Sequence, residues 1–163
     1  MNNEMKMEFD AIAENESFAR MTVAAFVMSL NPTLEELSDI KTAVSEAVTN
    51  AIIHGYGNLH GYEKNQYQPK EETVNVGKVY MECKIVGDVL FVDITDTGTG
   101  IEDLEKAMEP LYTTKPELNR SGMGFAFMEA FMDDMEVESS PGKGTKIHMI
   151  KKIGATPWVY EGE

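Results

Sequence analysis

The sequence has a single cysteine, Cys83, among its 163 residues. A disulfide within the chain is therefore excluded, and a metal cluster built on several cysteine ligands is excluded with it. The sequence also lacks an apolar run long enough for a membrane span. Its first ten residues interleave apolar side chains with Glu4, Lys6, Glu8 and Asp10, which is not the apolar core of a signal peptide. We therefore expect a cytoplasmic protein in a reducing compartment, without contact to a membrane.

Basic residues are scarce. Lysine and arginine number 14 against 28 aspartates and glutamates, which gives a formal net charge of -14 and an isoelectric point of about 4.6. A surface of this sign repels phosphate backbones and anionic lipid headgroups, and it attracts basic proteins. We therefore expect no direct binding of nucleic acid, and a basic protein is the partner that the charge favours.

Several common catalytic motifs are also missing. The sequence contains no G-x-x-x-x-G-K-S/T phosphate loop, no G-x-G-x-x-G dinucleotide fingerprint, no H-E-x-x-H zinc motif and no G-x-S-x-G nucleophile elbow. Hydrophobic residues make up 42% of the chain and charged residues 26%, which is the balance of one soluble globular domain. The chemistry of the chain must therefore come from less common motifs.

The first half of the sequence predicts one strand and two helices. Residues 5–11 alternate between apolar and charged side chains, as in a half-buried strand. Asn15 is a candidate N-cap for a helix that runs to about Leu30. Thr33 and Glu36 have the spacing of a capping box and begin a second helix, which Gly55 ends. The buried face of the first helix is predicted from helical spacing to be Phe18, Met21, Thr22, Ala25 and Phe26.

The second half predicts two hairpins separated by helices. Residues 56–75 have no sustained apolar period and are expected to form a long loop. Residues 79–95 form a hairpin around Gly87-Asp88, a short acidic helix covers 102–108, and Gly122 opens another helix before a closing hairpin over 135–150. We therefore expect an α/β fold, an α+β two-layer sandwich with the helices packed on one face of a mixed β-sheet. The domain would cover residues 1–150, followed by a tail.

Glu46 and Asn50 are the first pair that could carry chemistry. They are four residues apart on the second helix, so they share a face beside the apolar residues of that helix. A carboxylate and a carboxamide in this arrangement offer a proton acceptor and an oxygen ligand for Mg²⁺. A solvated polar row on an amphipathic helix remains the alternative at this point.

Two glycine-containing segments are the other candidates. Asp96 to Gly100 (D-T-G-T-G) follows a strand, where a carboxylate can accept a hydrogen bond from an exocyclic amine and glycines allow close approach of the backbone. Arg120 to Gly124 (R-S-G-M-G) opens a helix whose first amides could bind phosphate oxygens. Taken singly, the first could be an ordinary turn and the second a flexible connector.

In sequence order, these motifs and a late G-T resemble the ATP-binding boxes of the GHKL superfamily, which has the Bergerat fold. Longer segments, at 15–20, 44–56, 110–125 and 131–134, are similar to the anti-sigma F factor family of endospore-forming bacteria. The resemblance covers nearly all of residues 1–150. It is interrupted after Tyr56 by an apparent insertion, and the C-terminal tail also departs from it.

The resemblance implies an ATP-dependent protein serine kinase that also binds and inhibits a sporulation sigma factor of the sigma F type. Its substrate would be a serine of an anti-anti-sigma protein, its cofactors ATP or ADP with Mg²⁺, and its state a homodimer. Glu46 would be the general base, Asn50 the Mg²⁺ ligand and Asp96 the acceptor for the adenine amino group. The remaining nucleotide contacts implied are Gly98, Gly100, Thr114, Lys115, Arg120, Ser121, Gly122, Gly124 and Thr145. Arg20 would contact protein partners, although a solvated helix arginine is also consistent with the sequence.

Three alternatives remain open from the sequence. The chain could be an ATP-gated module that binds a sigma factor without kinase activity. It could be the equivalent kinase of a stress-response sigma factor. It could also be the catalytic domain of a histidine kinase, which the contexts of His54, His60 and His148 disfavour because none of them lies in a dimerising helix.

Overall fold

The computed structural model describes residues 1–57, 76–109 and 124–154. The elements follow the predicted order β-α-α-β-β-α-α-β-β. Their bounds are β1 Asn2–Asp10, α1 Glu14–Val27, α2 Leu34–Asn50, β2 Lys78–Val86, β3 Val89–Asp96, α3 Leu104–Ala107, α4 Gly124–Phe131, β4 Asp134–Ser140 and β5 Gly144–Lys152. A short 3-10 helix, Met28–Leu30, follows α1, and a π-helical turn, Ala51–Gly55, follows α2.

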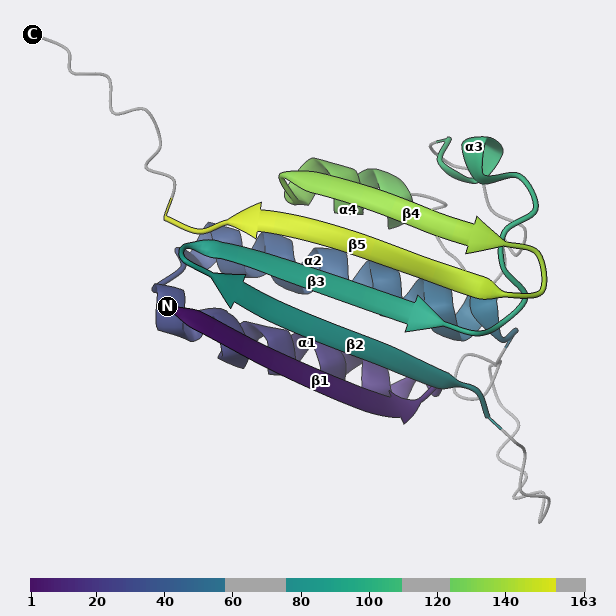
Figure 1. Ribbon diagram of the computed structural model, residues 1–163, viewed down its shortest axis with the longest axis horizontal. Coiled ribbons are helices and arrows are strands. Elements are labelled where there is room, and N and C mark those ends of the chain that lie inside the picture. Colours follow the sequence, from purple (N-terminus) through teal and green to yellow (C-terminus); the bar gives the residue numbers. More distant parts are fainter. Residues whose placement is uncertain (58–75, 110–123, 155–163) are drawn as a thin grey trace, which may run out of the picture.

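The described strands form one sheet in the order β1-β2-β3-β5-β4, and every neighbouring pair in it is antiparallel. The predicted α/β sandwich is confirmed, but the prediction of a mixed sheet is wrong. Tight turns join β2 to β3 and β4 to β5, and such turns require antiparallel pairing. Helices α1 and α2 connect β1 to β2, and these two strands also pair antiparallel. β3 and β4 run the same way, but β5 lies between them (Figure 1).

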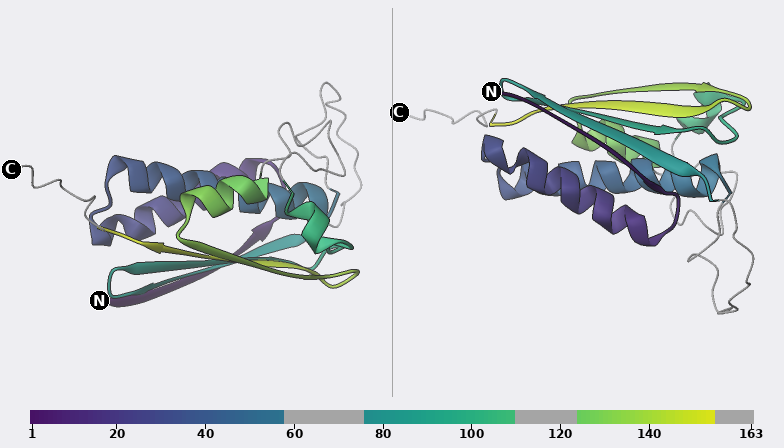
Figure 2. Two further views of the ribbon diagram at one scale, coloured as in Figure 1. Left: turned by 90° about the horizontal axis from the view of Figure 1, so that it is seen from above. Right: turned by 60° about the horizontal axis from the view of Figure 1, so that its bottom comes forward.

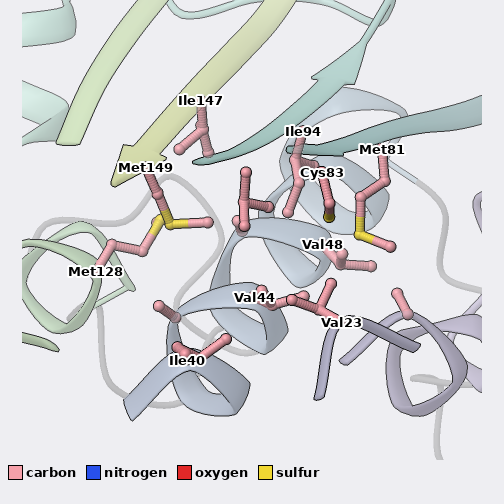
Figure 3. Close-up of a cluster of buried hydrophobic side chains, with 14 of the residues drawn as sticks. Val23, Ile40, Val44, Val48, Met81, Cys83, Ile94, Met128, Ile147 and Met149 are labelled. Atoms are coloured by element: carbon pink, nitrogen blue, oxygen red, sulfur yellow. The ribbon is translucent and has the colours of Figure 1, made fainter. Parts of the chain in front are cut away.

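Helices α1, α2 and α4 all pack on one face of the sheet, which makes the molecule two layers thick (Figure 2). The core between the layers is built from alternate residues of the strands and from one side of each helix. Figure 3 shows its centre, where α2 lies between the sheet and the flanking helices. The labelled side chains are Val23, Ile40, Val44, Val48, Met81, Cys83, Ile94, Met128, Ile147 and Met149, all buried.

The predicted capping box at the start of α2 is confirmed. The Glu36 amide donates to the Thr33 hydroxyl at 3.1 Å, and the Thr33 amide donates to Glu36 Oε2 at 2.8 Å. The other carboxylate oxygen of Glu36 accepts from the Gly154 amide at 2.9 Å. The last strand is therefore tied to the start of α2. Because β5 runs to Lys152 and Ile153 is buried, the packed domain extends past the limit of 150 expected from the sequence.

The start of α1 differs from the prediction. The helix begins at Glu14, and Asn15 lies inside it rather than at its N-cap. The Asn15 side-chain amide donates instead to the carbonyl of Asp10, at 2.9 Å. Asn15 therefore fixes the turn between β1 and α1, which satisfies a backbone acceptor in place of the helix amides that an N-cap would satisfy.

The buried face of α1 is also different from the one predicted. Phe18 and Met21 are 55% and 54% exposed, while the buried residues of the helix are Ala19, Val23, Ala24 and Val27. Helix α2, which packs against α1, also has small residues among its buried ones, Ala43 and Ala47. Small side chains on both helices allow close approach. Helix α1 has two apolar stripes, and packing selects the one with the smaller residues.

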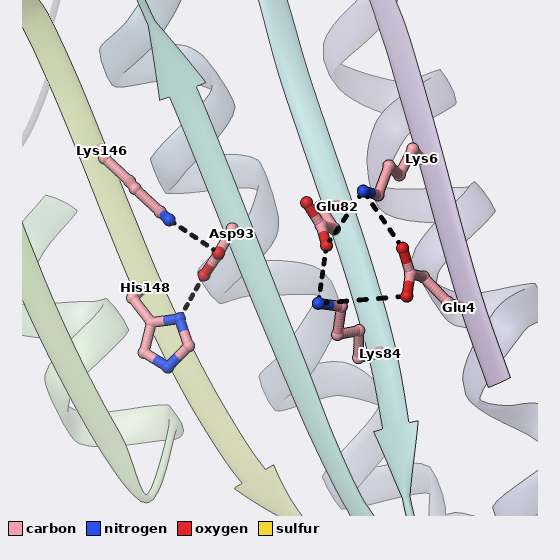
Figure 4. Close-up of polar contacts among 7 residues, drawn as sticks. All are labelled: Glu4, Lys6, Glu82, Lys84, Asp93, Lys146 and His148. Carbon is pink, nitrogen blue, oxygen red and sulfur yellow. Dashed lines mark hydrogen bonds and ion pairs between the residues drawn. The ribbon is translucent and has the colours of Figure 1, made fainter. Parts of the chain in front are cut away.

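The outer face of the sheet carries charged side chains in complementary pairs (Figure 4). On β1 and β2, Lys6 and Lys84 both pair with Glu82, at 3.6 and 2.9 Å. On β3 and β5, Asp93 pairs with Lys146 at 3.0 Å and also bonds His148. This pattern is typical of a solvated sheet face. In the part of the chain that is described, no helix is both long and apolar enough to cross a bilayer.

Candidate nucleotide-binding site

The candidate motifs meet at one end of the sandwich, where α2 and β3 finish and where α4 and β5 begin (Figure 1). Glu46 and Asn50 lie against the first residue of α4, Gly124. A methyl group added to Gly124 would be 3.2 Å from Glu46 Oε2 and 3.3 Å from Asn50 Nδ2. The structure therefore brings the carboxylate of Glu46 and the carboxamide of Asn50 to the start of a helix that lies more than seventy residues later in the sequence.

Glu46 and Asn50 reach this place because α2 is amphipathic. They border the buried stripe that includes Val44, Ala47 and Val48, and both are half-buried. A fully solvated polar row, the alternative left open by the sequence, is not what α2 presents here. A carboxylate that is only partly hydrated can act as a proton acceptor, and a neighbouring carboxamide oxygen can serve as a ligand for a hard cation.

The electrostatic setting of Glu46 favours such a role. Burial raises the pKa of the Glu46 carboxyl above its usual value, and the nearby Glu16 carboxylate raises this pKa further. Both effects disfavour the charged form. A general base is most effective when its pKa approaches the working pH, so this shift moves Glu46 in the useful direction.

The π-helical turn after Asn50 places a glycine against the end of β3. A side chain at Gly55 would contact the Asp96 carboxyl group at 2.8 Å, so only glycine leaves room for Asp96. The sequence predicted Gly55 as the end of the helix, and it is the last residue of the turn. Its contact with Asp96 could not be predicted, because the two residues are distant in sequence.

Asp96 is the one charged residue that is buried, at 5% exposure, among those the structure describes. Its Oδ1 accepts from the Gly98 amide at 3.0 Å, and the Thr145 backbone also donates to this carboxylate. Burial raises the pKa of Asp96 to about 6, while the two amide hydrogen bonds act in the opposite direction. A buried carboxylate at a strand end can accept further hydrogen bonds from a ligand such as an exocyclic amine.

The backbone of the segment after Asp96 packs closely against the backbone of two distant segments. A methyl group at Gly98 would overlap the carbonyl oxygen of Gly55, and one at Gly100, where φ is +71°, would overlap the carbonyl of Ser140. The Thr99 amide donates to Gly55 at 2.7 Å, and the Thr99 carbonyl accepts from the Gly142 amide at 2.7 Å. This segment is therefore not an ordinary exposed turn, since it joins the π-helical turn to the turn before β5.

Thr145 lies directly across the sheet from Asp96. Its hydroxyl is 2.8 Å from that of Ser139, which in turn accepts from the Ile101 amide at 2.8 Å. Thr145 therefore supports the loop that contains Gly98 and Gly100. Its role in binding a nucleotide stays a prediction.

Four residues at this end of the molecule were missed as site residues from the sequence. They are Gly55, Tyr56, Thr99 and Ser139. Tyr56 accepts from the Thr97 amide at 2.9 Å, and its ring fills the space that a side chain at Gly77 would need. No local pattern marks these residues, because each acts through a contact between distant segments.

The remaining predicted site residues are not part of the arrangement that the structure describes at this end. Thr114, Lys115, Arg120, Ser121 and Gly122 are outside the described residues. Arg20 is on α1, where its Nε lies 3.4 Å from Glu16 Oε1.

The described residues fit a nucleotide with Mg²⁺ in two respects. Asp96 offers a buried carboxylate to an amine, and Asn50 offers an oxygen beside the space that Gly124 leaves open. Within 1–57, 76–109 and 124–154, no group of three or more His, Cys, Asp or Glu side chains could hold a metal ion. Mg²⁺ typically keeps several waters and takes its other ligands from phosphate oxygens, so one amide oxygen is compatible with this ion.

Comparison with known proteins identifies relatives over almost the whole length. A family model described as a histidine kinase-like ATPase domain matches residues 9–151. The chain is 53% identical to a protein named anti-sigma F factor from Bacillus subtilis (strain 168), covering 94% of each chain. It is 54% identical to an anti-sigma F factor from Clostridium acetobutylicum, covering 94% of this chain and 96% of that protein.

A solved structure has the same fold. The crystal structure of the RsbU and RsbW domains of a Mycobacterium tuberculosis protein superimposes with a TM-score of 0.57 at 15% identity, covering 93% of this chain. The chain spans 32% of the length of that protein. At this identity the likeness shows the fold alone.

We predict that Gly98→Ala strongly weakens nucleotide binding. The added methyl group overlaps the Gly55 carbonyl oxygen, so the loop beside Asp96 must move. Calorimetric titration with Mg-ATP measures the change. Gly142→Ala is the matched control, because Gly142 has φ +75° but open space around it; this variant should lose about 1 kcal/mol of stability and keep its affinity for ATP. Equal affinities in the two variants would contradict the prediction.

We also predict that Asp96 makes the protein less stable as the pH rises. Its folded-state pKa, about 6, is above the ordinary aspartate pKa of 3.8, so the folded state binds a proton more tightly than the unfolded state. The stability that this proton contributes is lost as the pH rises through about 6. The free energy of unfolding of Asp96→Asn, relative to the original protein, should therefore increase between pH 5.2 and 7.5, by about 1 kcal/mol. Urea denaturation at both pH values measures it, and a difference that does not depend on pH would refute the assignment.

Proposed function

We propose a function for this chain, which belongs to the histidine kinase-like ATPase family and, within it, to the anti-sigma F factors: it is an ATP-dependent protein serine kinase that binds and inhibits a sporulation sigma factor. Its substrate is a serine of the anti-anti-sigma protein that antagonises this inhibition. Phosphorylation would prevent the antagonist from displacing the sigma factor. ATP binding and an anti-sigma role follow from the family, whereas serine specificity and both partners are our proposal.

The observation that carries the kinase proposal is the position of Glu46. Its carboxylate is half-buried, has a raised pKa, and lies with Asn50 at the start of α4. A module that used ATP only as a conformational ligand would have no need of a base here. Phosphoryl transfer depends mainly on positioning and charge neutralisation, so a positioned base and a cation ligand are the main requirements.

Each described residue then has a role. Asp96 accepts a hydrogen bond from the adenine amino group, and Gly98, Gly100 and Thr145 shape the pocket around it. Asn50 holds Mg²⁺ through its amide oxygen. Glu46 accepts the proton of the substrate serine hydroxyl as that oxygen attacks. Bound Mg-ATP would supply the γ-phosphoryl group, with ADP as the leaving group.

The remaining contacts to phosphate are proposed from the resemblance. They are Thr114, Lys115, Arg120, Ser121, Gly122 and Gly124, which supply backbone amides, hydroxyl groups and positive charge. Gly124 is the described member of this set, and its proximity to Glu46 and Asn50 supports the assignment.

The charge of the chain supports the proposed sigma factor partner. A sigma factor binds DNA and therefore carries basic surface, which a protein with a net charge of -14 attracts. This partner also places the proposed function in the cytoplasm.

We propose that two copies of the chain form a homodimer through the outer stripe of α1. Phe18 and Met21 belong to α1 and Met28 to the 3-10 helix that follows it, and all three side chains are more than half exposed. Bulky apolar side chains that cluster on one face of a helix are typical of an interaction surface. A second copy is the occupant that the family resemblance implies.

We predict that Glu46→Gln reduces the rate of phosphotransfer by at least about 100-fold while the affinity for Mg-ATP changes little. The amide keeps the size of the side chain and removes the proton acceptor. The measurement is transfer of labelled γ-phosphate to a purified anti-anti-sigma protein. A substrate that lacks its candidate serine is run in parallel.

Glu129→Gln is the matched control, because Glu129 is an exposed glutamate on α4 and its loss should leave the rate unchanged. Unchanged turnover in Glu46→Gln would remove the role of Glu46. If the original protein binds ATP and no label moves, the kinase proposal fails and the nucleotide-gated inhibitor replaces it.

We predict that Phe18→Glu shifts the protein from dimer to monomer. A carboxylate in the outer stripe of α1 would be desolvated in the interface, which costs several kcal/mol unless it is paired. Light scattering after size-exclusion chromatography measures the mass at micromolar concentration. Leu34→Glu makes the same apolar-to-acidic change on α2, at a side chain that is 86% exposed. This variant should stay dimeric, and a dimeric Phe18→Glu would show that the interface lies elsewhere.

A further inference from the structure

The hydroxyl group of Tyr56 lies between strands β2 and β3 at the point where β3 ends. The register of these strands pairs Val79 with Asp96. One residue further, Lys78 and Thr97 would face each other in a continued antiparallel ladder. The Tyr56 hydroxyl lies between them, because it accepts from the Thr97 amide at 2.9 Å and donates to the Lys78 carbonyl. A single side chain therefore bridges the two strands where they separate.

The same hydroxyl belongs to a row of hydrogen bonds that begins after Asp96. Three consecutive backbone amides follow this residue, and all three are bonded. The middle amide, of Gly98, donates to the Asp96 carboxylate at 3.0 Å. The amides on either side of it donate to the Tyr56 hydroxyl and to the Gly55 carbonyl. The bond that orients the Asp96 carboxylate is therefore flanked by two bonds to the end of the π-helical turn.

The ring of Tyr56 is held in place by its surroundings. It packs against the hydrophobic core, and a side chain at Gly77 would lie 2.3 Å from it. The carbonyl of Gly77 accepts from the Ala11 amide at 2.8 Å. The residue that covers the ring is thus tied to the turn between β1 and α1. The Tyr56 hydroxyl is therefore presented at a fixed point, which is what the precise placement of a binding group requires.

We propose that Tyr56 is a positioning residue for base recognition, whose hydroxyl fixes the Thr97 amide so that the Asp96 carboxylate points at the exocyclic amine of the nucleotide. This inference rests on the proposed function, because it requires Asp96 to bind that amine. Without the hydroxyl, the Thr97 amide and the Lys78 carbonyl both lose a partner. An unpaired backbone group is costly, so the turn would rearrange to satisfy it and would move the carboxylate.

The test compares ATP with purine riboside triphosphate, in which a hydrogen atom replaces the amino group of the base. Dissociation constants for both nucleotides with Mg²⁺ are measured by calorimetry at pH 7.5. Tyr56→Phe removes the hydroxyl and keeps the ring. We expect the original protein to prefer ATP by at least about tenfold. In Tyr56→Phe this preference should fall about three- to tenfold, through weaker binding of ATP.

Two further variants separate this role from a purely structural one. Tyr80→Phe makes the same change on β2, at a side chain that is 40% exposed, and it should keep the full preference. In an Asp96→Asn background, Tyr56→Phe should cause no further loss of preference. Thermal unfolding verifies that each variant is folded at the temperature of the titration. If Tyr56→Phe weakens both nucleotides equally, Tyr56 supports the fold alone and the inference is overturned.

Failure of the proposed function would give a different pattern. If the original protein binds both nucleotides equally, Asp96 does not bind the amine, and the proposed contact fails together with the inference. If the original protein prefers ATP and Tyr56→Phe keeps this preference in full, the inference alone is overturned. The measurement does not depend on phosphotransfer, so it decides the role of Tyr56 even if the kinase proposal fails.

Discussion

The arrangement of the site depends on the close packing of backbone around the buried carboxylate of Asp96. The carboxylate accepts from the Gly98 amide at 3.0 Å and lies where a side chain at Gly55 would be. On the opposite strand, a methyl group at Gly144 would overlap the Asp96 carbonyl oxygen. The ends of α2, β3 and β5 are therefore held at fixed distances from one another. Any ligand group that binds to Asp96 meets a surface formed by all three segments.

Helix α2 connects this end of the molecule with the other. Its first turn is fixed by the capping box, and Glu36 also binds the Gly154 amide after β5. Its last turn carries Glu46 and Asn50 and continues into the π-helical turn. Because the middle of α2 is packed between the sheet, α1 and α4, the helix cannot slide or rotate without disturbing the core. The position of Glu46 is therefore fixed by the packing of the whole domain.

The parts of the fold that local sequence determines were predicted well, and the parts that depend on long-range packing were not. The capping box at Thr33 and the hairpin turn at Gly87 follow from short patterns, and both are confirmed. The buried face of α1 was wrong, since the helix is apolar on two sides and only the shape of α2 selects Val23 over Phe18. The motif residues were identified by spacing, but the contact of Gly55 with Asp96 joins segments that no pattern connects.

The two sides of α1 have different chemistry. The outer side presents Phe18 and Met21 to solvent, whereas the inner flank carries the Glu16–Arg20 pair. Helix α1 therefore has an apolar side that faces solvent and a charged pair that is partly shielded from it, so two surfaces of different chemistry lie on one element.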